Sequence, residues 1–229
     1  MNEVRVWDLP TRLFHWSLAA CVIGLVITGN IGGNAMVWHG RLGYAVLTLL
    51  LFRLVWGLVG GHWSRFSSFL YSPASVIAYL RGQRRPEHGV GHNPLGMLSV
   101  LGLLLVLFAQ VTSGLFADDE IAFTGPLTGL VSGHWVSLAT GYHKEIGKLI
   151  LVALVALHLA AIAFYKLVRK QDLVRPMITG DKTVPADLPP SSDGARQRWL
   201  ALFILLLCAL AVYGLVSLGN GAVPVTSYD

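Results

Sequence analysis

The chain has 229 residues, of which 54% are hydrophobic and only 13% are charged, and its mean hydropathy is +0.62. Soluble domains carry about 25% charged residues, so this composition excludes an ordinary soluble globule. The two cysteines, Cys21 and Cys208, lie in apolar stretches without a Cys-x-x-Cys motif. A zinc site, an iron-sulfur cluster, covalent c-type haem and a disulfide are therefore unsupported.

Five long apolar stretches dominate the sequence. A hydrocarbon core of about 30 Å requires about 20 apolar residues per helix, and each stretch provides them. The first includes His15 and Trp16 and is followed by no small-residue cleavage site, which favours a span over a signal peptide. We predict an all-α polytopic membrane protein with helices near residues 12–31, 38–60, 94–116, 142–166 and 198–218.

The connections between these spans differ in character. The run from Ile121 to His143 is rich in glycine and contains Pro126, which predicts that most of it is an outer loop. Residues 66–82 contain Ser72-Pro73 as a helix start and predict a short helix in the membrane interface. Residues 181–197, rich in proline and serine, predict a flexible cytoplasmic linker. It would join a four-helix core, residues 1–180, to a fifth helix and tail, residues 198–229.

The basic residues predict the orientation. If the N-terminus is cytoplasmic, all but three of the 17 Lys and Arg lie on the inner side, and the three outside are Arg41, Lys144 and Lys148. Positively charged segments stay in the cytoplasm, so we expect the N-terminus inside and the C-terminus outside. The net charge of +5 then reflects topology and contact with anionic membrane lipid, and nucleic-acid binding is not expected.

Four of the eight histidines fall inside predicted spans: His15, His39, His143 and His158. Ionisable residues in membrane helices usually mark a functional site, although a single histidine near a helix end can face interfacial water. His39 and His143 both begin helices on the outside. His15 enters from the inside, and His158 lies about 22 Å along its helix from His143. Depth alone therefore pairs His39 with His143 and His15 with His158. The remaining histidines are expected in exposed connections: His62, His88, His92 and His134.

Two facing neutral histidines suit the axial positions of haem iron, with the macrocycle filling the space between helices. Zinc usually needs further ligands, and a proton relay needs acidic residues deep in the membrane. Apart from Glu145, in the first turn of its helix, the spans contain no acidic residue. We therefore predict two bis-histidine b-type haems per chain.

Small and basic residues accompany the outer histidines. Gly43 and Gly147 follow His39 and His143 by four residues, one turn deeper on nearly the same face. They could let a flat ring approach the backbone, or serve ordinary helix contacts. The outer basic residues are candidate partners of the haem propionates or simple interface anchors: Arg41, Lys144 and Lys148.

Arg53 places a charge within the second span, 14 residues after His39 and at about the level of His158. Such a charge needs a partner. The propionates of the inner haem or a quinone head group could supply one, or the side chain could extend to the inner membrane surface.

A set of ordered motifs resembles the bacterial cytochrome b561 and nickel-iron hydrogenase b-type cytochrome family over roughly residues 5–182. The motifs are Trp7-Asp8-Leu9-Pro10-Thr11-Arg12 with His15-Trp16, His39-Gly40-Arg41-Leu42-Gly43, Arg53-Leu54-Val55-Trp56, Gly91-His92-Asn93-Pro94-Leu95-Gly96, His143 with Ala156-Leu157-His158, and Val174-Arg175-Pro176-Met177-Ile178-Thr179-Gly180. The fifth helix lies outside the resemblance.

The resemblance implies a four-helix core in the bacterial inner membrane that binds two b haems and passes electrons between quinone and a redox partner. By position it assigns the same two histidine pairs. In the family the two ligands on the fourth helix are usually about 14 residues apart, whereas here the spacing is 15, and a π-bulge is one way to absorb the extra residue.

We interpret the chain as an electron-transfer subunit of a respiratory chain, linking quinone to a periplasmic cytochrome c, hydrogenase or dehydrogenase. The acidic residues Asp118 to Glu120 of the predicted outer loop could dock a basic periplasmic protein, or they could belong to a loop that is only exposed to water. The alternative is a stand-alone superoxide:quinone oxidoreductase of the same fold, in which the outer basic residues attract the anion. A third interpretation is a transporter or structural membrane protein with incidental histidines.

Overall fold

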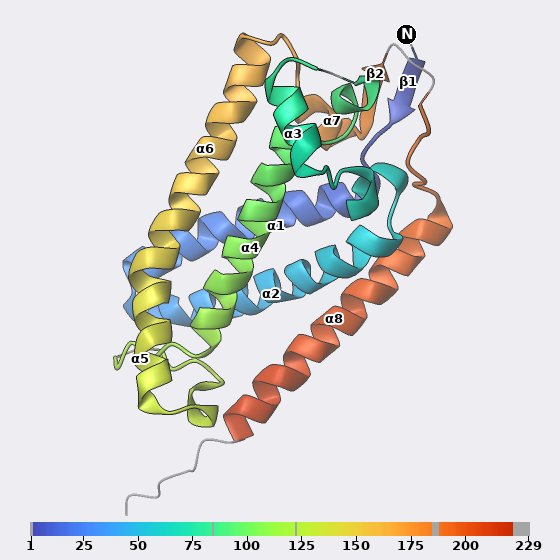
Figure 1. The fold of residues 1–229 in the computed structure, drawn as a ribbon. Helices are drawn as coiled ribbons and strands as arrows, with labels where there is room; N and C mark the ends of the chain where they lie inside the picture. Colours follow the sequence, from blue (N-terminus) through green and yellow to red (C-terminus); the bar gives the residue numbers. More distant parts are fainter. Residues whose placement is uncertain (1, 84, 122, 185–187, 222–229) are drawn as a thin grey trace, which may run out of the picture. The chain divides into compact units, whose positions relative to one another are not determined.

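Long helices make up most of the computed structural model, which describes residues 2–83, 85–121, 123–184 and 188–221 (Figure 1). Within these residues, five helical segments are long and apolar enough to cross a membrane. They contain α1 (Leu9–Ile31), α2 (Met36–Val59), α4 (Pro94–Leu115), α6 (Lys148–Leu167) and α8 (Ala195–Gly221). The predicted all-α polytopic fold class is confirmed.

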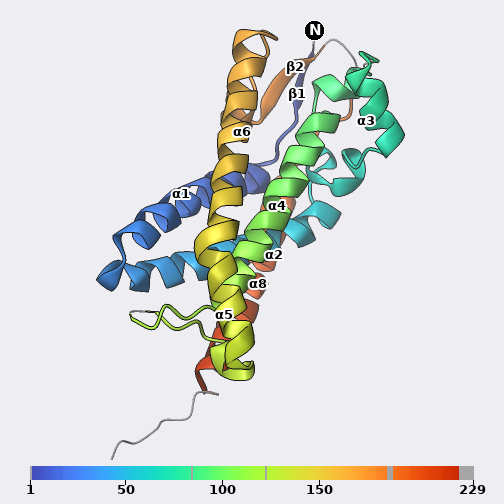
Figure 2. The ribbon, with the colours of Figure 1, turned by 60° about the vertical axis from the view of Figure 1, so that its left-hand side comes forward.

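The fourth span begins earlier than its glycines suggest. Helix α5 (Gly133–Gly141) runs through a π-helix (Tyr142–Gly147) directly into α6 (Figure 2). The prediction that the helix starts near residue 142 is therefore wrong, because a glycine costs a helix only about 1 kcal/mol and does not end it. The loop predicted here is confined to the residues before α5, where Asp118 and Thr124 form an isolated β-bridge.

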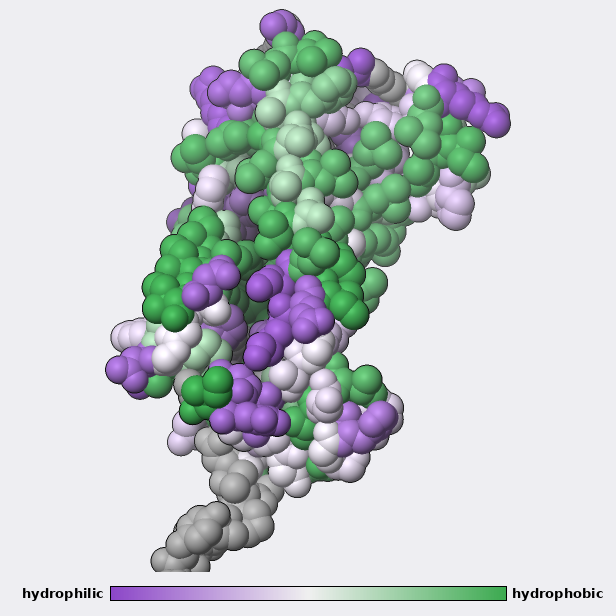
Figure 3. Space-filling model, turned by 90° about the vertical axis from the view of Figure 1, so that its left-hand side faces the viewer, coloured by the Kyte–Doolittle hydropathy of each residue, from purple (hydrophilic) through white to green (hydrophobic). Residues whose placement is uncertain are grey.

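Large apolar side chains cover the outside of the long helices, as a lipid environment requires. Leu105 is 71% exposed, Leu149 70% and Leu157 66%. The face drawn in Figure 3 is correspondingly hydrophobic along much of the helices. These side chains would be costly to hydrate and therefore fit a membrane protein.

The chain divides into two compact units, and each long helix contributes one end to each unit. Unit 1 comprises Met1–Trp16, Phe52–Leu104 and Ala153–Ile204. Unit 2 comprises Ser17–Leu51, Leu105–Val152 and Leu205–Asp229. His15 and His158 thus belong to unit 1, whereas His39 and His143 belong to unit 2.

A small sheet anchors unit 1. Strand β1 (Asn2–Arg5) pairs antiparallel with β2 (Asp181–Val184), next to α7 (Val174–Thr179) (Figure 1). Ser191 is buried and donates a hydrogen bond to the carbonyl oxygen of Val6 at 2.7 Å. The prediction of a flexible linker is therefore wrong for residues 181–184 and for Ser191, because the partners lie at the far end of the sequence. Residues 185–187 lie outside the described part of the chain.

The predicted short helix between the second and third spans is confirmed. Helix α3 (Pro73–Leu80) begins with Ser72 as its N-cap, and the Ser72 hydroxyl accepts a hydrogen bond from the Ser75 amide at 3.2 Å. Ile77 and Leu80 are 49% and 63% exposed, so one side of α3 offers apolar side chains to its surroundings.

Candidate functional site

The rings of His39 and His143 face each other in unit 2. Their centroids are 6.0 Å apart and their planes are inclined at 85°. A metal ion that binds one nitrogen of each ring at about 2.0 Å would place the centroids about 6 Å apart. The two side chains are thus spaced as a pair of axial ligands.

Backbone carbonyls fix the orientation of both rings. His39 Nδ1 lies 3.1 Å from the carbonyl oxygen of Leu25, and His143 Nδ1 lies 2.8 Å from that of Gln110. A carbonyl oxygen only accepts, so each Nδ1 carries the hydrogen and each Nε2 keeps its lone pair. Metal-binding histidines usually have such a partner on the other ring nitrogen, which also raises ligand basicity.

The π-helix lies at His143 itself. It spans Tyr142–Gly147 and includes His143, so the π-bulge expected from the 15-residue spacing is confirmed. A π turn disturbs the regular backbone ladder. The Gln110 side-chain amide donates to the His143 carbonyl oxygen at 2.8 Å. Gln110 therefore holds His143 at two points, its ring nitrogen and its carbonyl. Sequence reasoning missed this residue, although a lone amide in a membrane span was a signal.

Two glycines that sequence reasoning also missed make room for the imidazole rings of His39 and His143. A Cβ added at Gly29 would lie 3.1 Å from His39 Cε1, and one added at Gly114 would lie 2.8 Å from His143 Cε1. The predicted Gly43 lines open space, since an added Cβ would meet nothing within 4 Å. Gly147 is different, because it packs against Gln110 and Tyr142 and does not line this space.

A cavity of about 320 Å³ surrounds the outer pair. Its walls are mainly apolar, and its polar lining includes Lys144 and Lys148 as well as both histidines. Arg41 does not line it. The Arg41 guanidinium lies over the Trp38 ring, 5.1 Å from the centroid, as an interface anchor would. The structure thus brings two of the three predicted basic residues to the site.

The outer pair fits a bis-histidine haem. Ring spacing, free Nε2 atoms and glycine clearance are all features that an axially ligated flat macrocycle requires. Zinc would require further ligands. Within the described residues, no group of three or more His, Cys, Asp or Glu side chains is placed to hold a metal ion.

The inner histidines gather with two further nitrogen-bearing side chains in unit 1. His15 and His158 interact electrostatically but form no ring contact of the kind seen for the outer pair. His15 Nδ1 is buried, and no described group hydrogen-bonds to it. The other two side chains are His92 and Arg53.

His92 lies inside unit 1, so the prediction that it is solvent-exposed is wrong. Its ring centroid is 4.8 Å from that of Trp7 and 4.6 Å from that of Phe69. Burial, followed by the charges of Arg53, His158 and His15, lowers the pKa of His92 to about 3. His92 is therefore neutral at physiological pH, and its buried Nδ1 has no partner among the described residues.

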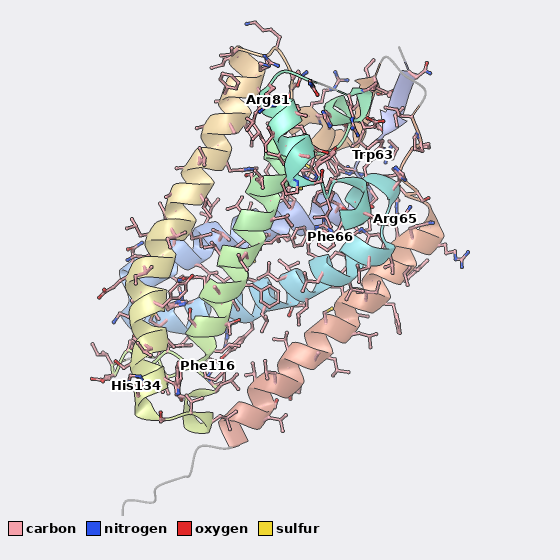
Figure 4. The ribbon with its side chains drawn as sticks, viewed as in Figure 1. Trp63, Arg65, Phe66, Arg81, Phe116 and His134 are labelled. Carbon is pink, nitrogen blue, oxygen red and sulfur yellow. The ribbon has the colours of Figure 1, made fainter. Side chains whose placement is uncertain are left out.

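Arg53 does not extend to the membrane surface, because it is only 3% exposed. Its guanidinium lies 4.8 Å from the centroid of the Phe66 ring, which Figure 4 labels near the end of α2. The buried Nη1 atom has no hydrogen-bond partner among the described residues. An unpaired buried donor is costly, so this nitrogen is available to an anionic or carbonyl ligand.

A buried carboxylate stabilises this part of unit 1. Asp8 is fully buried and accepts hydrogen bonds from the Thr11 amide, the Gly61 amide and the Ser64 hydroxyl at 2.8, 2.9 and 2.8 Å. The Trp56 indole also donates to it at 3.2 Å. Asp8 therefore joins the start of α1 to the end of α2, the helices that carry His15 and Arg53. Sequence reasoning found its motif but not this role.

Comparisons with known proteins agree with this architecture. A family model described as prokaryotic cytochrome b561 matches residues 6–180. A relative from Azotobacter chroococcum mcd 1, named a probable Ni/Fe-hydrogenase B-type cytochrome subunit, is 27% identical over 82% of this chain and 92% of its own length. Relatives of the same name from Bradyrhizobium diazoefficiens and Rhodobacter capsulatus are 25% and 24% identical, over 78% and 81% of this chain and 85% and 84% of their own lengths. The family resemblance is confirmed.

Proposed function

Because the chain belongs to the prokaryotic cytochrome b561 family and is thus a membrane b-type cytochrome, we propose that it carries electrons between quinone and a periplasmic redox partner. The observation that supports this most directly is the spacing of His39 and His143, with centroids 6.0 Å apart and both Nδ1 atoms directed to carbonyl oxygens. His39 and His143 would both bind the iron, and an iron held by two histidines would exchange electrons without binding a substrate.

At the outer site, His39 and His143 would hold the iron through Nε2. The haem supplies reversible one-electron chemistry when bound. The Leu25 and Gln110 carbonyls keep the two imidazoles in fixed orientations, so little rearrangement accompanies a change of charge. Lys144 and Lys148 line the same cavity and would pair with the two propionates.

At the inner site, His15 and His158 would hold a second b haem. The unpaired Arg53 Nη1 and His92 Nδ1 atoms support a ligand with oxygen acceptors beside this pair. That ligand would be the inner propionates or the head group of a quinone substrate. His143 in the π-helix and His158 in α6 belong to one continuous helical segment, so this segment would supply one ligand to each haem.

The partner is suggested by the relatives' names, which are those of Ni/Fe-hydrogenase cytochrome subunits. We infer a hydrogenase as the partner of this chain, with a dehydrogenase or cytochrome c as alternatives. The chain would lie in the bacterial inner membrane with its N-terminus in the cytoplasm. Asp118 to Glu120 would then face the periplasm, where a basic partner could dock.

A haem titration tests this proposal. Pyridine haemochrome analysis of the purified chain should give two b haems, and His39→Ala and His158→Ala should each remove one. His134→Ala is the matched control, since His134 is exposed on α5 (Figure 4) and should leave both haems in place. A full haem content in both ligand variants would refute the assignment. Isolation of the native complex should recover a hydrogenase or other redox partner.

A stand-alone superoxide:quinone oxidoreductase is the second candidate. Lys144 and Lys148 at the outer cavity favour attraction of a small anion. Superoxide-dependent quinone reduction by the isolated chain, lost in a Lys144→Gln/Lys148→Gln variant that keeps both haems, would support it over the subunit role. A chain that reduces quinone only with its partner present would contradict it.

A further inference from the structure

A second cavity lies in unit 1, away from the four ligand histidines. It has a volume of about 470 Å³ and is enclosed by residues of β1 and β2, the segment after α3, the end of α6 and the start of α7. Tyr79 of α3 and Tyr165 of α6 meet at its wall, with their hydroxyl oxygens 3.2 Å apart. The proposed electron transfer assigns no role to this cavity.

The lining carries an excess of positive charge. Its basic residues are Arg85, Arg169, Lys170, Arg175 and Lys182. None of them forms an ion pair with a carboxylate in the part of the chain that the structure describes. Five cations with so few counter-charges create a field that attracts an anion.

The lining contains three acidic residues, fewer than its basic residues. Asp181 pairs with Arg5 at 2.6 Å, outside the lining. Asp172 accepts hydrogen bonds from the amides of Val174 and Arg175 at 2.9 and 3.1 Å. Those amides leave the charge of Asp172 in place, so Asp172 and Glu3 face five basic residues and the cavity keeps an excess of positive charge.

Lys182 is the most informative of the basic residues. It lies on β2 and is partly buried, and burial lowers the pKa of its ammonium. A desolvated ammonium without an anion is costly, and a bound anion would remove that cost. The strand pairing that fixes Lys182 opposite Val4 also keeps the side chain beside the cavity.

The position of the cavity along the helices indicates where the anion comes from. It lies where α6 ends, next to Leu167 and Val168, which are 67% and 62% exposed. Its Tyr79 belongs to α3, whose Ile77 and Leu80 are also exposed. Apolar side chains exposed beside a basic cavity at a helix end are typical of the membrane interface, where lipid phosphates lie.

We propose that this cavity binds the phosphate of an anionic phospholipid, with Lys182, Arg169 and Arg85 as its main contacts. The lipid chains would leave along the exposed side of α3 and the end of α6. This binding is independent of the electron-transfer function, since none of the lining residues belongs to either histidine pair.

The test is a lipid titration of the full, haem-loaded chain in detergent, followed by native mass spectrometry. Phosphatidylglycerol, phosphatidylcholine and inorganic phosphate are the three probes. We expect phosphatidylglycerol to bind more tightly than phosphatidylcholine. Each basic contact removed should weaken phosphatidylglycerol binding about fivefold, so Arg169→Gln/Lys182→Gln should weaken it about 25-fold.

Arg81→Gln is the matched control. Arg81 is exposed at the end of α3 (Figure 4) and does not line the cavity, so its loss should leave phosphatidylglycerol binding unchanged. Arg85→Gln, at an exposed position, repeats the test if the double variant does not fold. Equal binding of the two lipids, an equal loss in Arg81→Gln, or saturation by inorganic phosphate at the lipid concentration would each overturn the proposal.

Discussion

Gly43 lies on α2 one turn after His39 and lines the outer cavity. A Cβ added there would meet no atom of the chain within 4 Å. Gly43→Ala should therefore leave the packing of the protein unchanged, and alanine favours a helix over glycine by about 1 kcal/mol. Any loss caused by this substitution must come from a group that occupies the cavity.

The expected loss follows from the proposed haem. A methyl group in space filled by a rigid ring overpacks the site, which costs about 1–3 kcal/mol. Since 1.4 kcal/mol is a factor of ten, the outer haem should bind about 5- to 150-fold more weakly. Gly114→Ala should weaken haem binding more than Gly43→Ala does. The added Cβ would lie 2.8 Å from Cε1 of His143, and the hydrogen bond to Gln110 keeps that imidazole ring from moving away.

The assay is the haem content of purified protein across a haem titration, by pyridine haemochrome. Gly214→Ala is the control, because Gly214 lies in α8, also has nothing within 4 Å of an added Cβ, and does not line the cavity. We expect full haem content in the control and loss of outer haem in Gly43→Ala. Equal haem affinity in the two variants would refute the placement of a ring beside Gly43.

Three further predictions concern the outer ligands and the sheet in unit 1. The 85° angle between the imidazole planes predicts a strongly anisotropic low-spin EPR signal from the outer ferric haem, and three well-resolved rhombic g values would contradict it. Gln110→Leu should weaken binding of the outer haem about 10- to 100-fold and change that EPR signal, because it removes the amide that donates to the His143 carbonyl oxygen. An unaltered EPR signal and an unaltered haem affinity would argue against this role of Gln110. Burial alone would raise the pKa of Asp193, but hydrogen bonds from the Leu9 amide, Arg198 and Arg5 outweigh it and lower that pKa. The ionised Asp193 side chain therefore stabilises the fold at any pH above its ordinary pKa of about 3.9, and this stabilisation is lost as the pH falls through its lowered pKa. Thermal melts should show a fall in melting temperature at acidic pH, and this fall should be smaller in Asp193→Asn.

The sequence by itself determined the features that depend on local properties. Apolar length decides which segments can cross a membrane, and the five spans follow from it. The cost of ionisable groups in lipid singled out the four histidines, and position along a helix assigned each to a depth. The spacing of 15 residues between His143 and His158, one more than the family resemblance implies, indicated a π-bulge as one way to absorb the extra residue, and a π-helix is present there.

Only the tertiary structure decided which atoms meet across helices. Rotation of each helix about its axis places Gly29 and Gly114 against two histidine rings, and directs Arg41 to Trp38 while Lys144 reaches the cavity. No periodicity within one helix contains that information, because it depends on packing between segments far apart in the chain.

The same reason explains the largest errors. His92 was expected in solvent, yet Trp7 and Phe69 enclose it. Residues 181–184 were expected to be flexible, yet they pair with residues 2–5 at the other end of the sequence. Pairing of strands separated by that much chain depends on the helices that bring their ends together, and the local sequence of neither strand specifies it.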